Sequence, residues 1–326
     1  MMELAPVKRI HVLTLLMLAA SLPAAHAQVG KWPDKPVRMI VPLAPGGGTD
    51  IVARMLAARL SAELGQQFIS DNRVGAGGSI GAEIAARANP DGYTVITVPA
   101  SYAANAALYK LSYDPVKGIA PIAMITTGPL ILTVHPSVQA TNLKEFIGLL
   151  RARPGALNFG SSGSGSFSHL AAELFRQMTR TDMTHVPYKS AGPALVDLLG
   201  GQIQIFFGSG PSTGPHIRAG RLRGLAVTTE RRSPAMPDLP AISELVPGYS
   251  ADFWFGMWAP AGTPKEIISR LNQTLVRILK QPDVLERLRT DSMEPVYSTP
   301  EAFARVIARD IAMWSKVVKA GNIKVN

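Results

Sequence analysis

Two glycine-rich segments, each between an expected strand and an expected helix, most constrain how this chain can fold. Residues 44–50 read Ala-Pro-Gly-Gly-Gly-Thr-Asp, and residues 160–166 read Gly-Ser-Ser-Gly-Ser-Gly-Ser; we call them the first and the second glycine loop. Glycine permits sharp turns and close backbone approach, and amide groups at a helix N-terminus lack intrahelical acceptors and lie at the positive end of the helix dipole. Neither loop contains Lys or Arg. Together the loops predict two halves of one site that binds a small carboxylate through neutral donors.

Strand-like and helix-like segments alternate along most of the chain. Strands are expected at 37–43, 67–72, 93–99, 130–135, 157–160, 184–188, 202–207 and 222–228, and helices at 50–64, 79–88, 142–153, 166–180, 193–199, 265–280 and from 300 onward. This alternation is typical of an α/β fold with mostly parallel strands. The length of 326 residues exceeds what one hydrophobic core usually organises, so two lobes are expected.

The first 27 residues have the pattern of a secretory signal peptide. Lys8 and Arg9 precede an apolar run over 10–20, and Ala25-His26-Ala27 supplies a small-x-small cleavage site. A membrane anchor is the alternative, but the apolar run is shorter than the ~20 residues that span a bilayer. We therefore expect an exported, soluble protein whose mature chain begins at Gln28.

Composition excludes several classes of site. The chain has no cysteine, which removes disulfides, zinc–thiolate sites and thiol catalysis. Its net charge of +10 favours anionic partners, but the basic residues are scattered without an aromatic platform, so nucleic acid is not an expected partner. No histidines occur at metal-ligand spacing and no nucleotide-binding glycine motif is present. We therefore expect neither a metal nor a cofactor.

Sequence motifs along nearly the whole mature chain occur in the same order as those of one protein family. They include Trp32-Pro33, Gly47-Gly48-Thr49-Asp50 with Ile51-Val52-Ala53-Arg54, Gly75-Ala76-Gly77-Gly78-Ser79-Ile80-Gly81, Pro90-Asp91-Gly92-Tyr93-Thr94, His185-Val186-Pro187-Tyr188-Lys189 and Ala259-Pro260-Ala261-Gly262-Thr263-Pro264. These segments are similar to the Bug or TctC family of periplasmic solute-binding proteins. The resemblance implies a two-lobed periplasmic-binding-protein fold of type II, with two mixed sheets flanked by helices and a ligand cleft between the lobes.

Turn residues that flank extended runs place the crossings between lobes near 126–129 and 249–254. We therefore expect residues 28–127 and 250–326 in lobe 1 and residues 128–249 in lobe 2. The resemblance further implies a periplasmic monomer that delivers an organic carboxylate to a membrane transporter of the tripartite tricarboxylate type. A sensor that touches a membrane signalling protein remains an alternative partner arrangement.

Carried over position by position, the resemblance places the ligand between the two glycine loops. The residues implied are Ala44, Gly47, Gly48, Thr49 and Asp50 on one side, and Ser161, Ser162, Gly163, Ser164, Gly165, Ser166 and His169 on the other. Asp50 is expected to fix its loop as a helix N-cap, because its charge would repel an anion. His169 is expected either to donate to the ligand, to orient Ser162, or to be structural.

Three further segments follow expected strands and are expected to shape the far end of the ligand. They are Ser101, Tyr102 and Asn105; Lys189, Ser190 and Ala191; and Gly208 and Ser209. Many similar proteins carry an aspartate where this chain has Gly208, which favours a ligand without an amino group. The adjacent Phe206 and Phe207 fit that preference, although they are also explained by a strand that alternates between two buried faces.

A hydrolase is the alternative from another class. Residues 77–81 are a literal G-x-S-x-G before an expected helix, so Ser79 is a candidate nucleophile, and His135, His169, His185 and His216 lie downstream. However, Asp71-Asn72-Arg73 precede the motif where a nucleophile elbow has a buried apolar strand. We therefore expect a binding protein and not an enzyme.

Overall fold

The computed structural model describes residues 1–2, 32–234, 236–320 and 323. The chain divides into two compact units, residues 1–32 and 33–326, and all helices and strands given below belong to the second. The expected signal peptide from residue 3 onward, and its cleavage after Ala27, lie outside the described residues. Among the helices of the described segments, none combines the length and the apolar character needed to cross a membrane.

The second unit alternates strands and helices, as the sequence predicts. Its strands are β1 (Val37–Val41), β2 (Phe68–Asn72), β3 (Thr94–Pro99), β4 (Ile119–Val134), β5 (Asn158–Ser161), β6 (Thr184–Pro187), β7 (Ile205–Ser209), β8 (Arg223–Val227), β9 (Asp252–Pro260) and β10 (Glu294–Pro295). Its helices are α2 (Gly48–Leu64), α3 (Ser79–Ala86), α4 (Ser101–Leu108), α5 (Leu143–Ala152), α6 (Phe167–Thr179), α7 (Ala191–Leu199), α8 (Gly210–Arg218), α9 (Lys265–Ile278), α10 (Pro282–Thr290) and α11 (Pro300–Ala320).

The strands form a mixed sheet in the order β2-β1-β3-β9-β4-β7-β5-β6, with β8 and β10 also paired to β4. Strand β1 is parallel to β2 and β3, and β5 is parallel to β6 and β7. Strand β9 is antiparallel to β3 and β4, and β4 is antiparallel to β7, β8 and β10. The expectation of mostly parallel strands is therefore wrong, because β4 and β9 run against their neighbours through the middle of the sheet.

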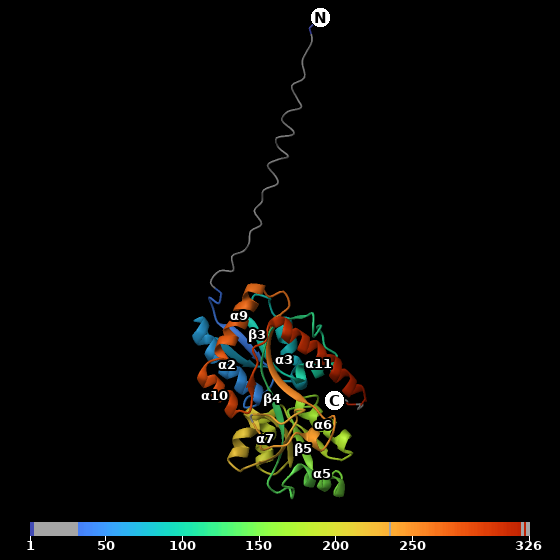
Figure 1. The fold of residues 1–326 in the computed structure, drawn as a ribbon. Coiled ribbons are helices and arrows are strands. Elements are labelled where there is room, and N and C mark those ends of the chain that lie inside the picture. Colours follow the sequence, from blue (N-terminus) through green and yellow to red (C-terminus); the bar gives the residue numbers. More distant parts are fainter. Residues whose placement is uncertain (3–31, 235, 321–322, 324–326) are drawn as a thin grey trace. The chain divides into compact units, whose positions relative to one another are not determined.

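Strand β4 connects the two halves of this sheet. Residues 119–129 pair with β9, whereas residues 130–134 pair with β7. Figure 1 shows the blue and the orange-to-red segments gathered around the first half and the green-to-yellow segments around the second. The two expected mixed sheets are thus joined through one strand, β4, and the division into lobes at 127 and 250 stays a prediction.

Helices cover the sheet and bury its apolar residues. The strands β1, β3 and β7 are almost wholly buried, which explains why they read as continuous apolar runs. In α11, Phe303, Ile307 and Trp314 repeat at helical spacing and are all buried. Helix α4 and the first half of β4 were not predicted. Helix α4 consists mainly of small residues without a periodic apolar face, and β4 contains Pro121 and Gly128.

The candidate functional region lies where certain strands lead into helices. Five of the strand-to-helix junctions end at the cavity described below, namely those from β1 into α2, β3 into α4, β5 into α6, β6 into α7 and β7 into α8. Ligands of open α/β sheets bind outside the carboxyl ends of the strands, where these junctions gather. The topology therefore positions several helix N-termini to face one another.

Candidate functional site

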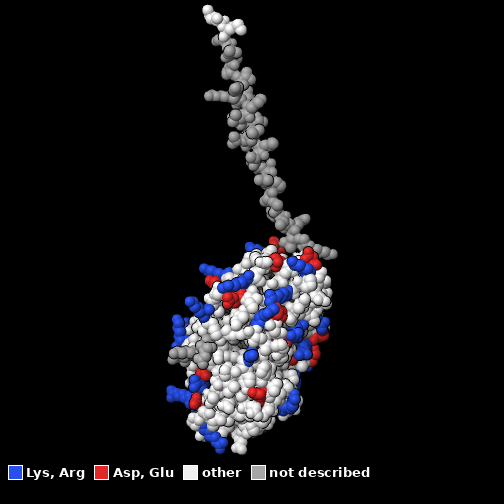
Figure 2. Space-filling model, turned by 180° about the vertical axis from the view of Figure 1, so that it is seen from behind, with Lys and Arg blue, Asp and Glu red and all other residues white. Residues whose placement is uncertain are grey.

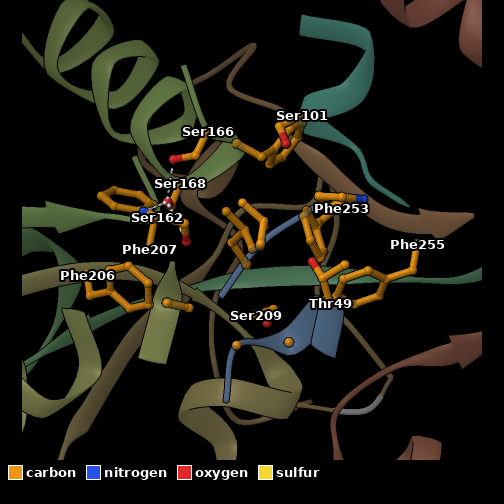
Figure 3. A pocket seen from close by; sticks show the side chains of 17 residues that line it. Thr49, Ser101, Ser162, Ser166, Ser168, Phe206, Phe207, Ser209, Phe253 and Phe255 are labelled. Carbon is orange, nitrogen blue, oxygen red and sulfur yellow. Dashed lines mark hydrogen bonds between the residues drawn. The ribbon is translucent and has the colours of Figure 1, made fainter. Parts of the chain in front are cut away.

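A small cavity of about 40 Å³ lies among these junctions (Figure 3). The polar side chains that line it are all hydroxyls, from Thr49, Ser101, Ser162, Ser166, Ser168 and Ser209. Five phenyl rings, from Phe167, Phe206, Phe207, Phe253 and Phe255, supply much of the remaining wall, together with Leu43, Gly47, Gly48, Pro99, Leu130 and Ala191. Within the described part of the chain, the lining includes no charged side chain.

Five helices begin at the wall of this cavity. Gly48, Ser101, Phe167 and Ala191 are the first residues of α2, α4, α6 and α7, and Ser209 directly precedes α8. Each helix N-terminus carries a partial positive charge and unpaired amide groups. The site is therefore positive in potential without a basic side chain, which suits a small anion. The glycine loops in the sequence predicted two of these helix starts as parts of the site. The other three were predicted only as segments at the far end of the ligand.

The first glycine loop is held by Asp50 from behind. The carboxylate of Asp50 accepts hydrogen bonds from the amide of Gly46 (3.1 Å), Nε of Arg54 (2.9 Å) and Nδ2 of Asn72 (3.0 Å). Burial alone would raise the pKa of Asp50, but these hydrogen bonds outweigh it and hold the pKa below its ordinary value. Asp50 does not line the cavity. The expected N-cap role is wrong, because Gly47 precedes the helix and Asp50 is its third residue.

Gly48 is required by close packing. A Cβ atom at this position would collide with Oγ of Ser209 and lie 3.2 Å from Cζ of Phe255. The bare backbone therefore lets the start of α2 approach the end of β7 and the middle of β9. Of the other predicted residues in this loop, Gly47 and Thr49 line the cavity, whereas Ala44 lines neither this cavity nor its neighbour.

The second glycine loop is tied together by its own side chains. Oγ of Ser161 accepts from the amide of Gly163 (3.2 Å), and Nδ1 of His169 accepts from the amide of Gly165 (3.1 Å), which has a φ of +78°. Ser166 is the N-cap of α6, since its Oγ accepts from the amide of His169. The amides of Gly163 and Gly165 are therefore engaged within the loop. The groups that face the cavity are the side chains of Ser162 and Ser166 and the first turn of α6 with Ser168.

Ser168, which the sequence analysis did not predict as a site residue, orients Ser162, a role that was one of those expected of His169. Oγ of Ser168 accepts from the amide of Ser162 (2.9 Å) and lies 3.0 Å from Oγ of Ser166. The three serine side chains lie together in Figure 3. His169 therefore supports the loop at Gly165 and does not orient Ser162. The only sequence signal for Ser168 was its position in the first turn of the helix.

Two stacked histidines, of which His169 is buried and His185 half-buried, lie behind the second loop. The rings of His169 and His185 are stacked with centroids 4.0 Å apart, and Nε2 of His185 lies 2.7 Å from Oγ of Ser161. Burial lowers the pKa of both histidines to about 4, so both are neutral near pH 7. Glu173 accordingly pairs with Arg176 (2.8 Å) rather than with a charged His169.

The remaining predicted residues are divided between places. Ser101 lines the cavity, but the hydroxyl of Tyr102 donates to the carbonyl of Pro115 (2.8 Å), and Nδ2 of Asn105 donates to the carbonyl of Gly77 (3.1 Å). Tyr102 is buried and does not line the cavity, so its expected role in shaping the far end of the ligand is not supported there. Ser190 is buried and caps α7 through the amide of Gly192.

A second cavity of about 550 Å³ adjoins the first and shares Leu43 and Ser162 with it. Its walls include the predicted residues Gly163, Ser164 and Lys189. The exposed Lys189 therefore faces this wider space and not the hydroxyl-lined cavity. Tyr109 also lines it, and its hydroxyl donates to the carbonyl of Ser164 (2.6 Å). Neither Tyr109 nor this contact was predicted.

The strand that carries Gly208 places two rings on opposite faces. Phe206 packs in the apolar cluster with Ala194 and Leu198 of α7, and Phe207 packs against Phe175 of α6 with ring centroids 5.8 Å apart. The explanation of Phe206 and Phe207 as neighbours on a strand with two buried faces is correct, and both rings also line the cavity. A Cβ atom at Gly208 would collide with the methyl group of Thr213. Gly208 does not line the cavity, so the ligand preference drawn from this position is not supported there.

Ser79 lacks the surroundings of a nucleophile. It is buried at the start of α3, and its Oγ has no hydrogen-bond partner in the structure. His169 and His185 are engaged with each other and with the second loop instead.

In the described residues no group of acidic or histidine side chains is arranged to hold a metal ion. Figure 2 shows the molecule from the side opposite to that of Figure 1. On this face, basic and acidic side chains are interspersed and the basic ones do not gather into one patch.

Comparisons with known proteins identify the family to which this chain is similar. A family model described as the tripartite tricarboxylate transporter family receptor matches residues 52–323. Protein BugT of Bordetella pertussis is 36% identical over 314 residues, which are 95% of this chain and 96% of that protein.

Two solved structures of Rhodopseudomonas palustris proteins are similar throughout. Rpa4515 with adipate has a TM-score of 0.87 and 39% identity, and the match covers 90% of this chain and all of that one (100%). MatC with bound malate has a TM-score of 0.83 and 33% identity, covering 88% of this chain and 100% of that one. The fold is thus the α/β periplasmic-binding-protein fold that the resemblance implied.

Proposed function

Because this chain belongs to the family of tripartite tricarboxylate transporter receptors, we propose that it captures a small organic carboxylate in the hydroxyl-lined cavity and delivers it to a transporter of that type. The observation that carries the site is the meeting of five helix N-termini at a cavity without charged side chains. Adipate and malate, the ligands of the two similar structures, are carboxylates. The ligand contacts proposed here are the first turns of α2 and α6 and the hydroxyls of Ser162, Ser166 and Ser168.

The ligand is proposed to lack an amino group. This preference rests on the lining and not on Gly208. An ammonium group would meet the positive ends of helices and no carboxylate acceptor, since the carboxylate of Asp50 is directed to Gly46, Arg54 and Asn72. Desolvation of an unpaired ammonium is unfavourable.

A thermal-shift screen of organic acids against the purified mature protein tests the receptor function. A ligand present at about a hundred times its dissociation constant is expected to add ~2.7 kcal/mol to the free energy of unfolding. Carboxylates are expected to raise the melting temperature, whereas the matching amides and alcohols are not. A panel in which no carboxylate stabilises the protein contradicts the proposal.

We propose a cellular location and a partner together with this function. The exported protein is expected to begin at Gln28, which mass spectrometry of periplasmic material measures; a full-length chain in the membrane fraction contradicts it. A monomer that docks to the transporter is the favoured arrangement. A pull-down that recovers a membrane signalling protein in place of transporter subunits would favour the sensor alternative.

The absence of catalysis is also a proposal. We expect Ser79→Ala to bind the carboxylate with unchanged affinity, because Ser79 lines neither of the two cavities. The wild-type protein is expected to release no product from an activated ester. A burst of product that disappears in Ser79→Ala would restore the hydrolase alternative.

A further inference from the structure

The outer face of helix α11 carries several basic side chains and, beyond its first turn, no acidic one among its described residues. The exposed charged residues of α11 after Glu301 are Arg305, Arg309, Lys316 and Lys319, which we call the basic face of α11. Resting on the proposed export for its cellular setting, we propose that this basic face binds the surface of a membrane that contains anionic phospholipids. The inference goes beyond carboxylate capture, since α11 contributes no residue to the described lining of either cavity.

Helical spacing gathers the basic face on one side of α11. The opposite side is buried against the rest of the molecule, at Phe303, Ile307, Asp310, Trp314 and Val318. On a helix with about 3.6 residues per turn, the basic positions lie together on the side away from these buried residues. From Arg305 to Lys319 the row extends about 21 Å along the helix axis. Figure 1 shows α11 on the outside of the second unit, so this row is open to a partner.

The basic face is largely unpaired. In α10, by contrast, the exposed Arg289 binds Glu286 of the same helix (2.8 Å). Among the ion pairs between described residues, the basic face of α11 takes part in one, between Arg309 and the buried Asp310 (2.7 Å). The other three side chains of the face therefore keep their charge available to an external anion.

Helix stability does not account for the whole face. Cations in the last turn of a helix interact favourably with the negative end of its dipole, which explains Lys319. The effect is confined to the last turn, so it explains neither Arg305 nor Arg309, which lie in the first half of the helix. These two arginines are four residues apart, a spacing at which like charges destabilise a helix. An external anion would relieve that repulsion.

An extended anionic surface fits this face better than a small ligand or a protein does. A straight row about 21 Å long can place its four cations near a flat membrane at once. Each Lys or Arg close to an anionic membrane strengthens binding roughly fivefold, and the net charge of +10 adds a general attraction. Protein interfaces are instead enriched in aromatic residues and depleted in lysine. The exposed residues of α11, among those described, include no aromatic side chain.

Co-sedimentation of the mature protein with lipid vesicles tests the proposal. One set of vesicles contains phosphatidylcholine alone, and the other contains phosphatidylcholine and phosphatidylglycerol in equal molar amounts. We expect the wild-type protein to bind the mixed vesicles at least tenfold more tightly than the neutral ones, because only the mixed vesicles carry a net charge. Added salt should release the protein, since exposed charges are screened over ~10 Å at an ionic strength of about 0.1 M.

A combined variant and a control with the same change in net charge locate the binding surface. The variant of the basic face is Arg305→Glu, Lys316→Glu and Lys319→Glu. Arg309 is left in place because it pairs with Asp310. The control replaces three exposed basic residues outside α11, as Lys144→Glu, Arg231→Glu and Arg270→Glu. We expect the variant of the basic face to bind the mixed vesicles at least tenfold more weakly than the control.

Melting temperatures show whether both variants fold. If one does not, the corresponding glutamine substitutions replace glutamate in both proteins, and the expected difference is then at least threefold. Equal binding by the two variants, or no preference of the wild type for the mixed vesicles, overturns the inference. Neither result bears on the proposed function, because the vesicle assay contains no carboxylate ligand. Conversely, a thermal-shift panel without a stabilising carboxylate rejects the receptor function, and the vesicle result still decides this inference.

Discussion

Gly48 is the residue at which one added methyl group should matter most. In Gly48→Ala the new Cβ would collide with Oγ of Ser209 and crowd Phe255, so the start of α2 could not stay as close to the end of β7 and the middle of β9. We expect calorimetry to show at least a tenfold loss of carboxylate affinity, because the amide groups at the start of α2 would no longer be placed to bind the carboxylate. Gly148→Ala is the matched control, because a Cβ there meets no atom within 4 Å. Lys189→Gln should change affinity less than threefold; a larger effect there than at Gly48 would contradict the neutral-donor site.

At the scale of elements, the end of α4 supports the second glycine loop. The hydroxyl of Tyr109 donates to the carbonyl of Ser164, a contact between segments 55 residues apart. Removing it in Tyr109→Phe should cost ~0.5–1.5 kcal/mol, which is roughly a two- to tenfold increase in the dissociation constant if the bond holds the loop in its binding form. Tyr102→Phe is the matched control, because that hydroxyl donates to Pro115 and not to the loop. Stopped-flow dissociation rates should rise only in Tyr109→Phe; equal rates in the two variants would assign no binding role to the contact.

For the whole molecule, the stacked pair of His169 and His185 makes folding stability depend on pH. The pKa of His169 and of His185 is lowered by burial from 6.5 to about 4. As the pH falls below 6.5 the unfolded chain takes up protons that the folded protein does not, so the free energy of unfolding decreases until about pH 4 and levels off below it. Each histidine contributes a slope of up to ~1.4 kcal/mol per pH unit. Urea denaturation at a series of pH values should show a shallower dependence in His185→Gln than in the control His135→Gln. Identical slopes in these variants would exclude the pair as the cause.

The sequence by itself determined most of the local elements, and it predicted the chemistry of the proposed site. Apolar runs that end in Pro-Gly or Gly-Ser turns predicted β1, β5 and the helices that follow them, because periodicity and turn chemistry are properties of short segments. The absence of basic residues from both glycine loops predicted neutral recognition of an anion. The same local signals failed for α4, which lacks an amphipathic face, and for β4, which contains proline and glycine.

Only the tertiary structure decided which residues share the site. Phe253 and Phe255 reach the cavity because β9 pairs with β3 and β4, strands more than a hundred residues earlier in the chain. The same packing brought five helix starts together, turned Asp50, Tyr102 and Gly208 away from the cavity, and stacked His169 on His185. Strand pairing and side-chain direction depend on register between distant segments. No short stretch of sequence contains that information, so the loops were predictable and the ring wall was not.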